Sequence, residues 1–222
     1  MSLVVVSIDA LRQGAPSSLH SLLAVLPTSP QQAIVDVAYG ALAFTVGYGI
    51  GAINPAVIIA RVRGTDLRAV GSGNPGATNA GRAFGWQVGV LVALLDILKG
   101  FLPVLAFELL DRPNAALLAG LAAVIGHITS PFLRGRGGKG VATSLGAVLA
   151  VQPVWLVPVL LVFGVVFLAT RRVGVSSVAG ALMLVPASLW RHGSTGQIVF
   201  AVALALLILV RHRRNLLALL GR

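Results

Sequence analysis

The chain has 222 residues, of which 57% are hydrophobic and only 10% are charged. Soluble domains carry about 25% charged residues, so this composition excludes a soluble enzyme, a disordered chain and a coiled coil, and it indicates a polytopic membrane protein of one domain. Seventeen Lys and Arg face six Asp and Glu, and because these cations cluster between apolar stretches, they favour a membrane topology over a nucleic-acid partner.

Residues 1–35 show no regular pattern. Their apolar stretches are too short to span a bilayer, and no cationic region precedes the first of them, so a signal peptide is not indicated. We expect an N-terminal extension that is interfacial or disordered, followed by a membrane domain over residues 36–222.

The regular pattern consists of seven apolar segments. Several are shorter than the ~20 residues that a straight span needs, and short helices are tolerated at membrane depth where they line a polar cavity. Segment 140–151 is expected to be such a helix. The sequence therefore predicts an all-α integral membrane protein with seven transmembrane helices. They cover residues 36–60, 86–110, 114–130, 140–151, 153–170, 175–190 and 196–211.

Basic residues fall in alternate connections between these segments. With seven spans, thirteen of the seventeen cations lie on one side of the membrane, whereas six or eight spans would scramble the alternation. The positive-inside rule then places the N-terminus outside and the C-terminus in the cytoplasm. The cations on the cytoplasmic side are Arg61, Arg63, Arg68, Arg82, Arg134, Arg136, Lys139, Arg171, Arg172, Arg211, Arg213, Arg214 and Arg222.

Glycines inside the spans have the spacing of close helix contacts. Gly47 and Gly51 stand four residues apart, as do Gly85 and Gly89. Small residues at this interval let helix backbones approach each other in lipid, so we interpret these glycines as packing positions.

Two glycine-rich loops differ from ordinary membrane turns. Residues 71–82 read GSGNPGATNAGR, and residues 126–140 read GHITSPFLRGRGGKG. Each contains GxGxxG, but no βαβ unit fits the chain, and Gly140 stands where a Walker A motif needs Ser or Thr. Glycines still allow backbone N–H groups to converge on an anion, and a helix starting after each loop adds its positive end. Neutral donors (Ser72, Asn74, Thr78, Asn79) and two cations (Arg82, Lys139) complete the loops.

Two further places lie on the same predicted face. Ser176 and Ser177 open the sixth segment, where a serine serves equally as a helix cap or as a phosphate donor. His212 and Asn215 close the seventh segment and share one helical face. Taken alone they would be structural, but their i,i+3 spacing allows both side chains to reach a common ligand.

Asp96 and Lys99 form an i,i+3 ion pair inside the second segment. Ionisable residues within a span suggest function. However, if the helix begins near Phe84, Lys99 lies roughly 22 Å along it, far from the loops. We therefore favour a structural role for this pair.

The loops lack the ligands for metal chemistry. Apart from Asp66 at the edge of the first, these places contain no carboxylate, which Mg²⁺ and Ca²⁺ prefer. The four histidines are scattered over both predicted faces, which disfavours zinc. With no carboxylate to orient a histidine, Ser-His-Asp chemistry is not expected either.

These motifs identify a family. The chain resembles the bacterial acyl-phosphate:glycerol-3-phosphate acyltransferases, PlsY, over about residues 40–222. The resemblance rests on Ser72–Arg82, on Gly126–Thr143, on His212 and Asn215 with Gly221 after them, and on Asp96, Lys99 and Gly100. It implies a seven-helix enzyme of the bacterial inner membrane whose site faces the cytoplasm. That enzyme moves a fatty acyl group from acyl phosphate to the 1-hydroxyl of glycerol 3-phosphate and releases lysophosphatidic acid and phosphate, the first acylation in phospholipid synthesis.

The resemblance also implies residue roles. Ser72, Thr78 and Ser177 correspond to the lining of a phosphate hole for the acyl donor, with Ser176 as the alternative to Ser177. Arg82, Lys139, His212 and Asn215 correspond to groups that hold the phosphorylated substrates. Substrate-binding residues are thus expected to be Ser72, Asn74, Thr78, Asn79, Arg82, His127, Lys139, Ser177, His212 and Asn215, with Ser72, Arg82, Lys139, His212 and Asn215 catalytic.

A mechanism follows as a hypothesis. A mixed anhydride is already activated, so neither a covalent acyl-enzyme, a metal nor another cofactor is expected, and positioning and charge stabilisation suffice. The hydroxyl proton passes to the leaving phosphate or to His212. Partners are then the two small substrates and the lipid bilayer, without nucleic acid, and the protein is a monomer. The alternative function is a membrane transporter for phosphate or a phosphate ester, which would use the same cationic loops around a midplane site.

Overall fold

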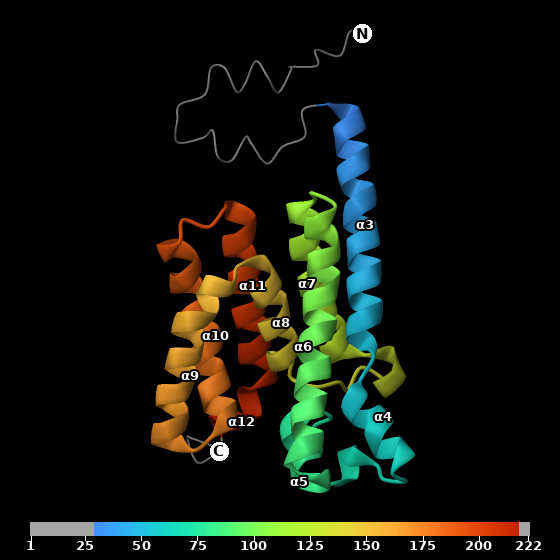
Figure 1. Ribbon diagram of the computed structural model, residues 1–222, viewed down its shortest axis with the longest axis vertical. Coiled ribbons are helices and arrows are strands. Elements are labelled where there is room, and N and C mark those ends of the chain that lie inside the picture. Colours follow the sequence, from blue (N-terminus) through green and yellow to red (C-terminus); the bar gives the residue numbers. More distant parts are fainter. Residues whose placement is uncertain (1–28, 218–222) are drawn as a thin grey trace.

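The structure is a computed structural model that describes residues 29–217, and these residues form an all-helical bundle (Figure 1). Short 3₁₀ turns join some of the helices at Leu67–Ala69 (η1), Pro131–Leu133 (η2) and Pro153–Trp155 (η3). The helices are α3 (Pro30–Ala52), α4 (Pro55–Val62), α5 (Ala77–Phe84), α6 (Trp86–Leu109), α7 (Pro113–Thr129), α8 (Val141–Val151), α9 (Leu156–Thr170), α10 (Val173–Trp190), α11 (Thr195–Arg211) and α12 (Arg213–Leu217).

The first helix begins six residues before the predicted boundary at residue 36. Ser29 caps it by accepting a hydrogen bond from the Gln32 amide at 3.1 Å, and Pro30 occupies the first turn. Proline fits there because its missing N–H has no helical partner at that position. Residues 30–35 are therefore helical, and the rest of the predicted extension, residues 1–28, lies outside the described residues.

The predicted apolar segment 36–60 lies within one candidate span, Pro30–Val62, but its helix is interrupted. The helix ends at Ala52 and restarts at Pro55. Proline removes an amide donor and disfavours helical geometry in the residue before it. Asn54 caps the restart by accepting from the Val57 amide at 3.0 Å. The break places α4 at the end of the bundle where the glycine loops gather (Figure 1).

Within residues 29–217, five helical stretches are long and apolar enough to cross a membrane. The remaining two predicted segments are the shorter apolar helices α8 and α11. The predicted short helix 140–151 is confirmed as α8, whose 11 residues extend only ~16 Å. The long stretches are Pro30–Val62, Trp86–Leu109, Pro113–Leu133, Pro153–Thr170 and Val173–Trp190.

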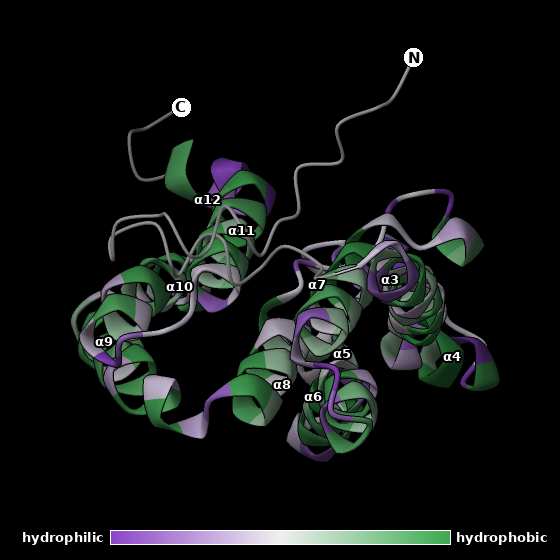
Figure 2. Ribbon diagram, turned by 90° about the horizontal axis from the view of Figure 1, so that it is seen from above, coloured by the Kyte–Doolittle hydropathy of each residue, from purple (hydrophilic) through white to green (hydrophobic). Residues whose placement is uncertain are grey.

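The helices form two groups that α8 connects. Seen from above, α3, α6 and α7 pack together on one side, α9, α10 and α11 on the other, and α8 lies between them (Figure 2). α8 contacts α6, α7 and α9, while α11 contacts α7. The arrangement places a short helix at the centre, where a cavity opens beside it.

Close packing at the predicted glycines is confirmed for the first pair. A Cβ on Gly47 or Gly51 would collide with the backbone of α7 at Ala119 and Ala123. The second pair differs. Gly89 packs against Gly81 of α5, but Gly85 has a φ of +96° and forms the turn between α5 and α6. Glycine tolerates that backbone conformation, which is strained for other residues.

Candidate active site

A cavity of 1540 Å³ lies where the glycine loops, α8, α10 and the end of α11 meet. Among the described residues that line it, Asp96 is the one carboxylate, against eight Lys and Arg. The structure brings together every site residue that the sequence predicts. All of Ser72, Asn74, Thr78, Asn79, Arg82, His127, Lys139, Ser177, His212 and Asn215 line this cavity.

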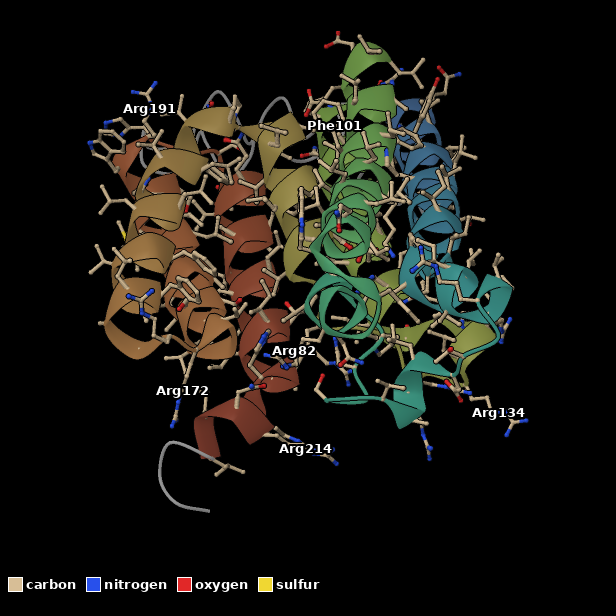
Figure 3. All side chains as sticks on the ribbon, turned by 60° about the horizontal axis from the view of Figure 1, so that its bottom comes forward. Arg82, Phe101, Arg134, Arg172, Arg191 and Arg214 are labelled. Atoms are coloured by element: carbon tan, nitrogen blue, oxygen red, sulfur yellow. The ribbon has the colours of Figure 1, made fainter. Side chains whose placement is uncertain are left out.

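The cationic end of the bundle is also visible directly. Arg82, Arg134, Arg172 and Arg214 lie at the end that carries the cavity, whereas Arg191 lies at the opposite end (Figure 3). Basic side chains are therefore distributed unevenly between the two ends of the bundle.

The first loop is organised by Asn79, which is 1% exposed. Its Oδ1 accepts from the Ser72 amide at 3.0 Å, and its Nδ2 donates to the carbonyls of Leu67 and Val70 at 3.0 and 2.9 Å. These bonds lie within the loop, so Asn79 organises the loop, and its predicted contact with substrate stays a prediction. Ser72 and Thr78 remain exposed. Gly76 offers α5 no side-chain cap, which leaves amides of the first turn available to an anion.

The second loop is folded back onto the end of α7. The Gly137 and Gly138 amides donate to the carbonyls of Ile128 and His127 at 3.0 and 3.1 Å. From the other side, Arg211 Nη2 donates to the carbonyls of Gly137 and Gly138, both at 3.1 Å. The sequence analysis counted Arg211 only among the cations of the cytoplasmic side, and the structure shows that it holds this loop.

Lys139 leaves this loop to cross the cavity. Its Nζ donates to Asn215 Oδ1 at 2.7 Å, which joins the loop to α12. Burial, and then the nearby charges of Arg211 and Arg82, lower the pKa of Lys139. An incoming phosphate offsets both effects because its negative charge favours the protonated amine. The cluster is therefore suited to an anion.

His212 is held in one tautomer. It is 2% exposed, and its Nδ1 lies 2.8 Å from the Ile208 carbonyl oxygen. That oxygen only accepts, so we assign the hydrogen to Nδ1, which leaves a lone pair on Nε2. Burial lowers the pKa of His212 below its usual value. Burial therefore favours the neutral ring, and its free Nε2 lone pair is available to a hydrogen-bond or proton donor.

The serines that open α10 differ in their place. Ser177 lines the cavity, whereas Ser176 is buried without bordering it. Both hydroxyls donate to carbonyls one turn earlier, Ser177 to Val173 at 2.8 Å and Ser176 to Arg172 at 3.1 Å. Nearby, Asn215 packs against Gly174, where a Cβ would meet its amide. The geometry therefore favours Ser177 of the two candidates.

The expectation that the Asp96–Lys99 pair lies far from the loops is wrong for Asp96. It lines the cavity, and its Oδ1 lies 3.5 Å from His127 Nδ1. The reason is that the second loop does not extend away from the bundle. It packs against His127, which brings the cavity inward along α6.

Beyond the polar groups, the cavity continues as an apolar arm. α8, α9 and α10 line it, and the side chains are Leu145, Val148, Leu156, Val159, Leu160, Phe163 and Leu184. Ser177 and Leu184 are seven residues apart on α10, which corresponds to ~10 Å. The cavity thus joins a cationic end to an apolar arm.

Sequence comparison gives this arrangement a family. The family model described as glycerol-3-phosphate acyltransferase matches residues 41–222. The chain belongs to the glycerol-3-phosphate acyltransferase family. Curated members include a glycerol-3-phosphate acyltransferase of Anaeromyxobacter sp. (strain Fw109-5), 42% identical over 82% of this chain and 93% of its own. Glycerol-3-phosphate acyltransferase 1 of Deinococcus radiodurans is 45% identical over 79% of this chain and 89% of its own.

Solved structures of the family have the same fold. The crystal structure of PlsY (YgiH), an integral membrane glycerol 3-phosphate acyltransferase, in its glycerol 3-phosphate form superposes with a TM-score of 0.78. It is 37% identical and covers 82% of this chain and 92% of its own. The lysophosphatidic acid form of PlsY gives a TM-score of 0.76 at 36% identity, with the same coverage.

Proposed function

We propose that this family member transfers a fatty acyl group from acyl phosphate to the 1-hydroxyl of glycerol 3-phosphate, and that the cavity is the site of the reaction. The observation that carries the proposal is the union of a cationic end and an apolar arm in one cavity. An acyl phosphate matches this cavity, because its phosphate fits the cationic end and its fatty chain fits the apolar arm. The ligand-named forms of PlsY, with glycerol 3-phosphate and with lysophosphatidic acid, support the same acceptor and product.

The two phosphates need separate sets of donors. Ser72, Thr78 and Ser177, together with the open amides at the start of α5, form the phosphate hole of the acyl donor. Arg82, Lys139 and Asn215 hold the glycerol 3-phosphate opposite it. The forked donors of Arg82 fix the orientation of the acceptor phosphate. The mobile point charge of Lys139 follows small shifts of that phosphate.

The chemistry is a direct displacement. The 1-hydroxyl oxygen attacks the acyl carbonyl carbon, a new ester C–O bond forms, and the anhydride C–O bond breaks to release inorganic phosphate. Negative charge grows on the carbonyl oxygen and the leaving phosphate, where Lys139 and Arg82 stabilise it. No acyl-enzyme is formed, and no metal takes part.

The reaction itself is tested with purified protein in detergent. With palmitoyl phosphate and glycerol 3-phosphate, we expect phosphate and lysophosphatidic acid in equal amounts, unaffected by EDTA and dependent on both substrates. Mass spectrometry of the lipid and a phosphate assay follow the two products. Detergent removes the two compartments that transport needs, so product formation separates transfer from transport. Folded protein that makes no product from either acyl phosphate or acyl-CoA would contradict the proposal.

The hydroxyl proton is expected to pass to Nε2 of His212 and from there to the leaving phosphate, which departs as hydrogen phosphate. Because burial lowers the pKa of His212, the ring accepts a proton at pH 7 and loses this capacity only as the pH falls through that lowered pKa. His212→Gln should lower kcat by about 10²–10⁴-fold and remove this acid limb. A limb near pH 6 from the substrate phosphate should persist. Steady-state kinetics between pH 5 and pH 8.5 would check this. Substantial turnover of His212→Gln with the wild-type acid limb retained would instead mean that the hydroxyl proton passes directly to the leaving phosphate.

We further propose that the chain spans the bacterial inner membrane seven times as a monomer, with the cavity and the C-terminus in the cytoplasm. The charge asymmetry of Figure 3 supports this orientation. The chain contains no cysteine, so single cysteines report topology directly. In intact spheroplasts, a membrane-impermeant maleimide should label Arg191→Cys and leave Arg134→Cys unlabelled until the cells are opened. The reverse pattern would overturn the orientation.

A further inference from the structure

Three ionisable side chains are buried together between α6 and α7. Asp96, Lys99 and His127 are 2%, 6% and 4% exposed. Lys99 Nζ lies 2.8 Å from Asp96 Oδ1, and His127 Nδ1 lies 3.5 Å from the same oxygen. Ionisable groups are costly at membrane depth, and apolar residues of similar size would pack there at lower cost. The contacts of the three suggest what they provide in return.

Lys99 binds the break between α3 and α4. Its Nζ donates to the Ile53 carbonyl at 2.7 Å. In a continuous helix this carbonyl would accept from the Val57 amide, but that amide donates to Asn54 Oδ1 instead. A buried carbonyl without a partner is unfavourable. The ammonium group therefore satisfies the backbone at the point where the helix is interrupted.

The same break holds both glycine loops. Asn54 Nδ2 donates to the Pro75 carbonyl of the first loop at 3.0 Å, and this bond is buried. Ser130, at the start of the second loop, donates through Oγ to the Ala52 carbonyl at 2.6 Å. A shift of the break would therefore move both loops relative to each other.

His127 connects the cluster to Lys139. Its carbonyl accepts from the Gly138 amide, and its ring occupies the space that a Cβ at Gly138 would need. Asp96 Oδ1 faces Nδ1 of the ring at 3.5 Å, which is a contact and not a hydrogen bond. Lys139 follows Gly138 directly in the chain, so the place of its amine depends on this stack.

We propose that Asp96, Lys99 and His127 form a positioning cluster that fixes the separation of the two glycine loops across the cavity. Lys99 fixes the first loop through the helix break, and Asp96 holds Lys99 by their ion pair and lies beside His127, on whose ring the second loop packs. His127 thus acts behind Lys139 rather than by touching substrate. The inference rests on the proposed function, because the separation affects turnover only if the loops hold the two reacting substrates, whose alignment then sets the rate.

The separation can be measured without substrates. The full chain has no cysteine. Ala69, at the end of η1 just before the first loop, and Arg136, in the second loop, are both exposed. Spin labels on Ala69→Cys and Arg136→Cys give a distance distribution by pulsed electron resonance in detergent. We expect a narrow distribution in this parent protein and a broad one when Lys99→Met is added.

A matched control separates positioning from stability. Val104 lies on the same helix and is fully buried, so Val104→Ala lowers thermal stability by removing packing without touching the loops. At equal loss of thermal stability, Val104→Ala should keep the narrow distribution and kcat. Lys99→Met should lower kcat by about 10-fold or more through misalignment, and Lys99→Arg, which keeps the donor and the charge, should recover part of it.

If Lys99→Met fails to fold because Asp96 is left unpaired, the double variant Asp96→Asn/Lys99→Met removes both charges and gives the same test. A narrow distribution with unchanged kcat in the variant that folds would overturn the proposal. Equal broadening in Val104→Ala would overturn it too, since any loss of stability would then suffice. Should the unsubstituted protein make no product, the proposed function fails, while the label distances still decide the positioning inference.

Discussion

Lys139→Ala is expected to lower kcat/KM by about 10²–10³-fold, the usual cost of removing one preorganised charge from a developing anion. Lys139 is the cation that reaches across the cavity, from the second loop to Asn215. Its lowered pKa reflects burial and neighbouring positive charge that only an anion offsets, so its contribution is largest when the substrate phosphates are bound. Phosphate release at varied concentrations of each substrate gives the measurement.

The control for Lys139 comes from the same loop. Arg134 is exposed and does not line the cavity. Arg134→Ala removes one positive charge from the same end of the molecule. It should leave kcat/KM within about 2-fold, because an exposed charge outside the cavity is screened by salt. Equal losses in the two variants would mean that Lys139 acts only through the general positive field of this end.

Gly137→Ala is expected to lower kcat by about 100-fold, the effect of shifting catalytic groups by roughly 1 Å. A Cβ at this position would collide with the His127 carbonyl oxygen. The carbonyl oxygen belongs to the backbone and the Cβ is fixed to its own backbone, so no side-chain rotation relieves the collision. The loop must move, which breaks the bond from the Gly137 amide to Ile128 and the bonds from Arg211. Lys139 is then displaced.

Gly164 provides the comparison for this variant. It lies in α9, where a Cβ would meet nothing within 4 Å. Gly164→Ala should keep activity and gain slightly in stability, since alanine favours helix. Thermal unfolding in detergent and phosphate release would be measured for both. A Gly137→Ala protein with full turnover would show that the loop does not set the position of Lys139.

The helical segments were predictable because apolar length and charge alternation are properties of the sequence alone. The break at Asn54–Pro55 was missed, although Pro55 within the first segment signals it. An interrupted helix is stabilised only by its tertiary contacts. Lys99, Ser130 and Pro75 come from distant parts of the chain, and no local pattern brings them to the break.

The members of the site were predictable from motifs, but their individual tasks were not. In the sequence, Asn79 and Ser72 are equivalent as hydrogen-bond donors. Only the fold shows that the side chain of Asn79 forms its hydrogen bonds within the loop. Arg211 reads as a helix-end cation until its bonds to Gly137 and Gly138 are seen. Asp96 was placed too far away because distance along one helix was used without the fold of the second loop.

The cationic end and the apolar arm of the cavity meet beside the short helix α8. This arrangement affects how the substrates reach the cavity and how the product leaves it. Glycerol 3-phosphate dissolves in water, whereas a long-chain acyl phosphate resides in the bilayer leaflet. A reaction at their boundary lets each arrive from its own phase. Lysophosphatidic acid is then formed with its head group already facing water and its chain already among lipids, so it enters the leaflet without carrying charge across the hydrocarbon core, which would be costly.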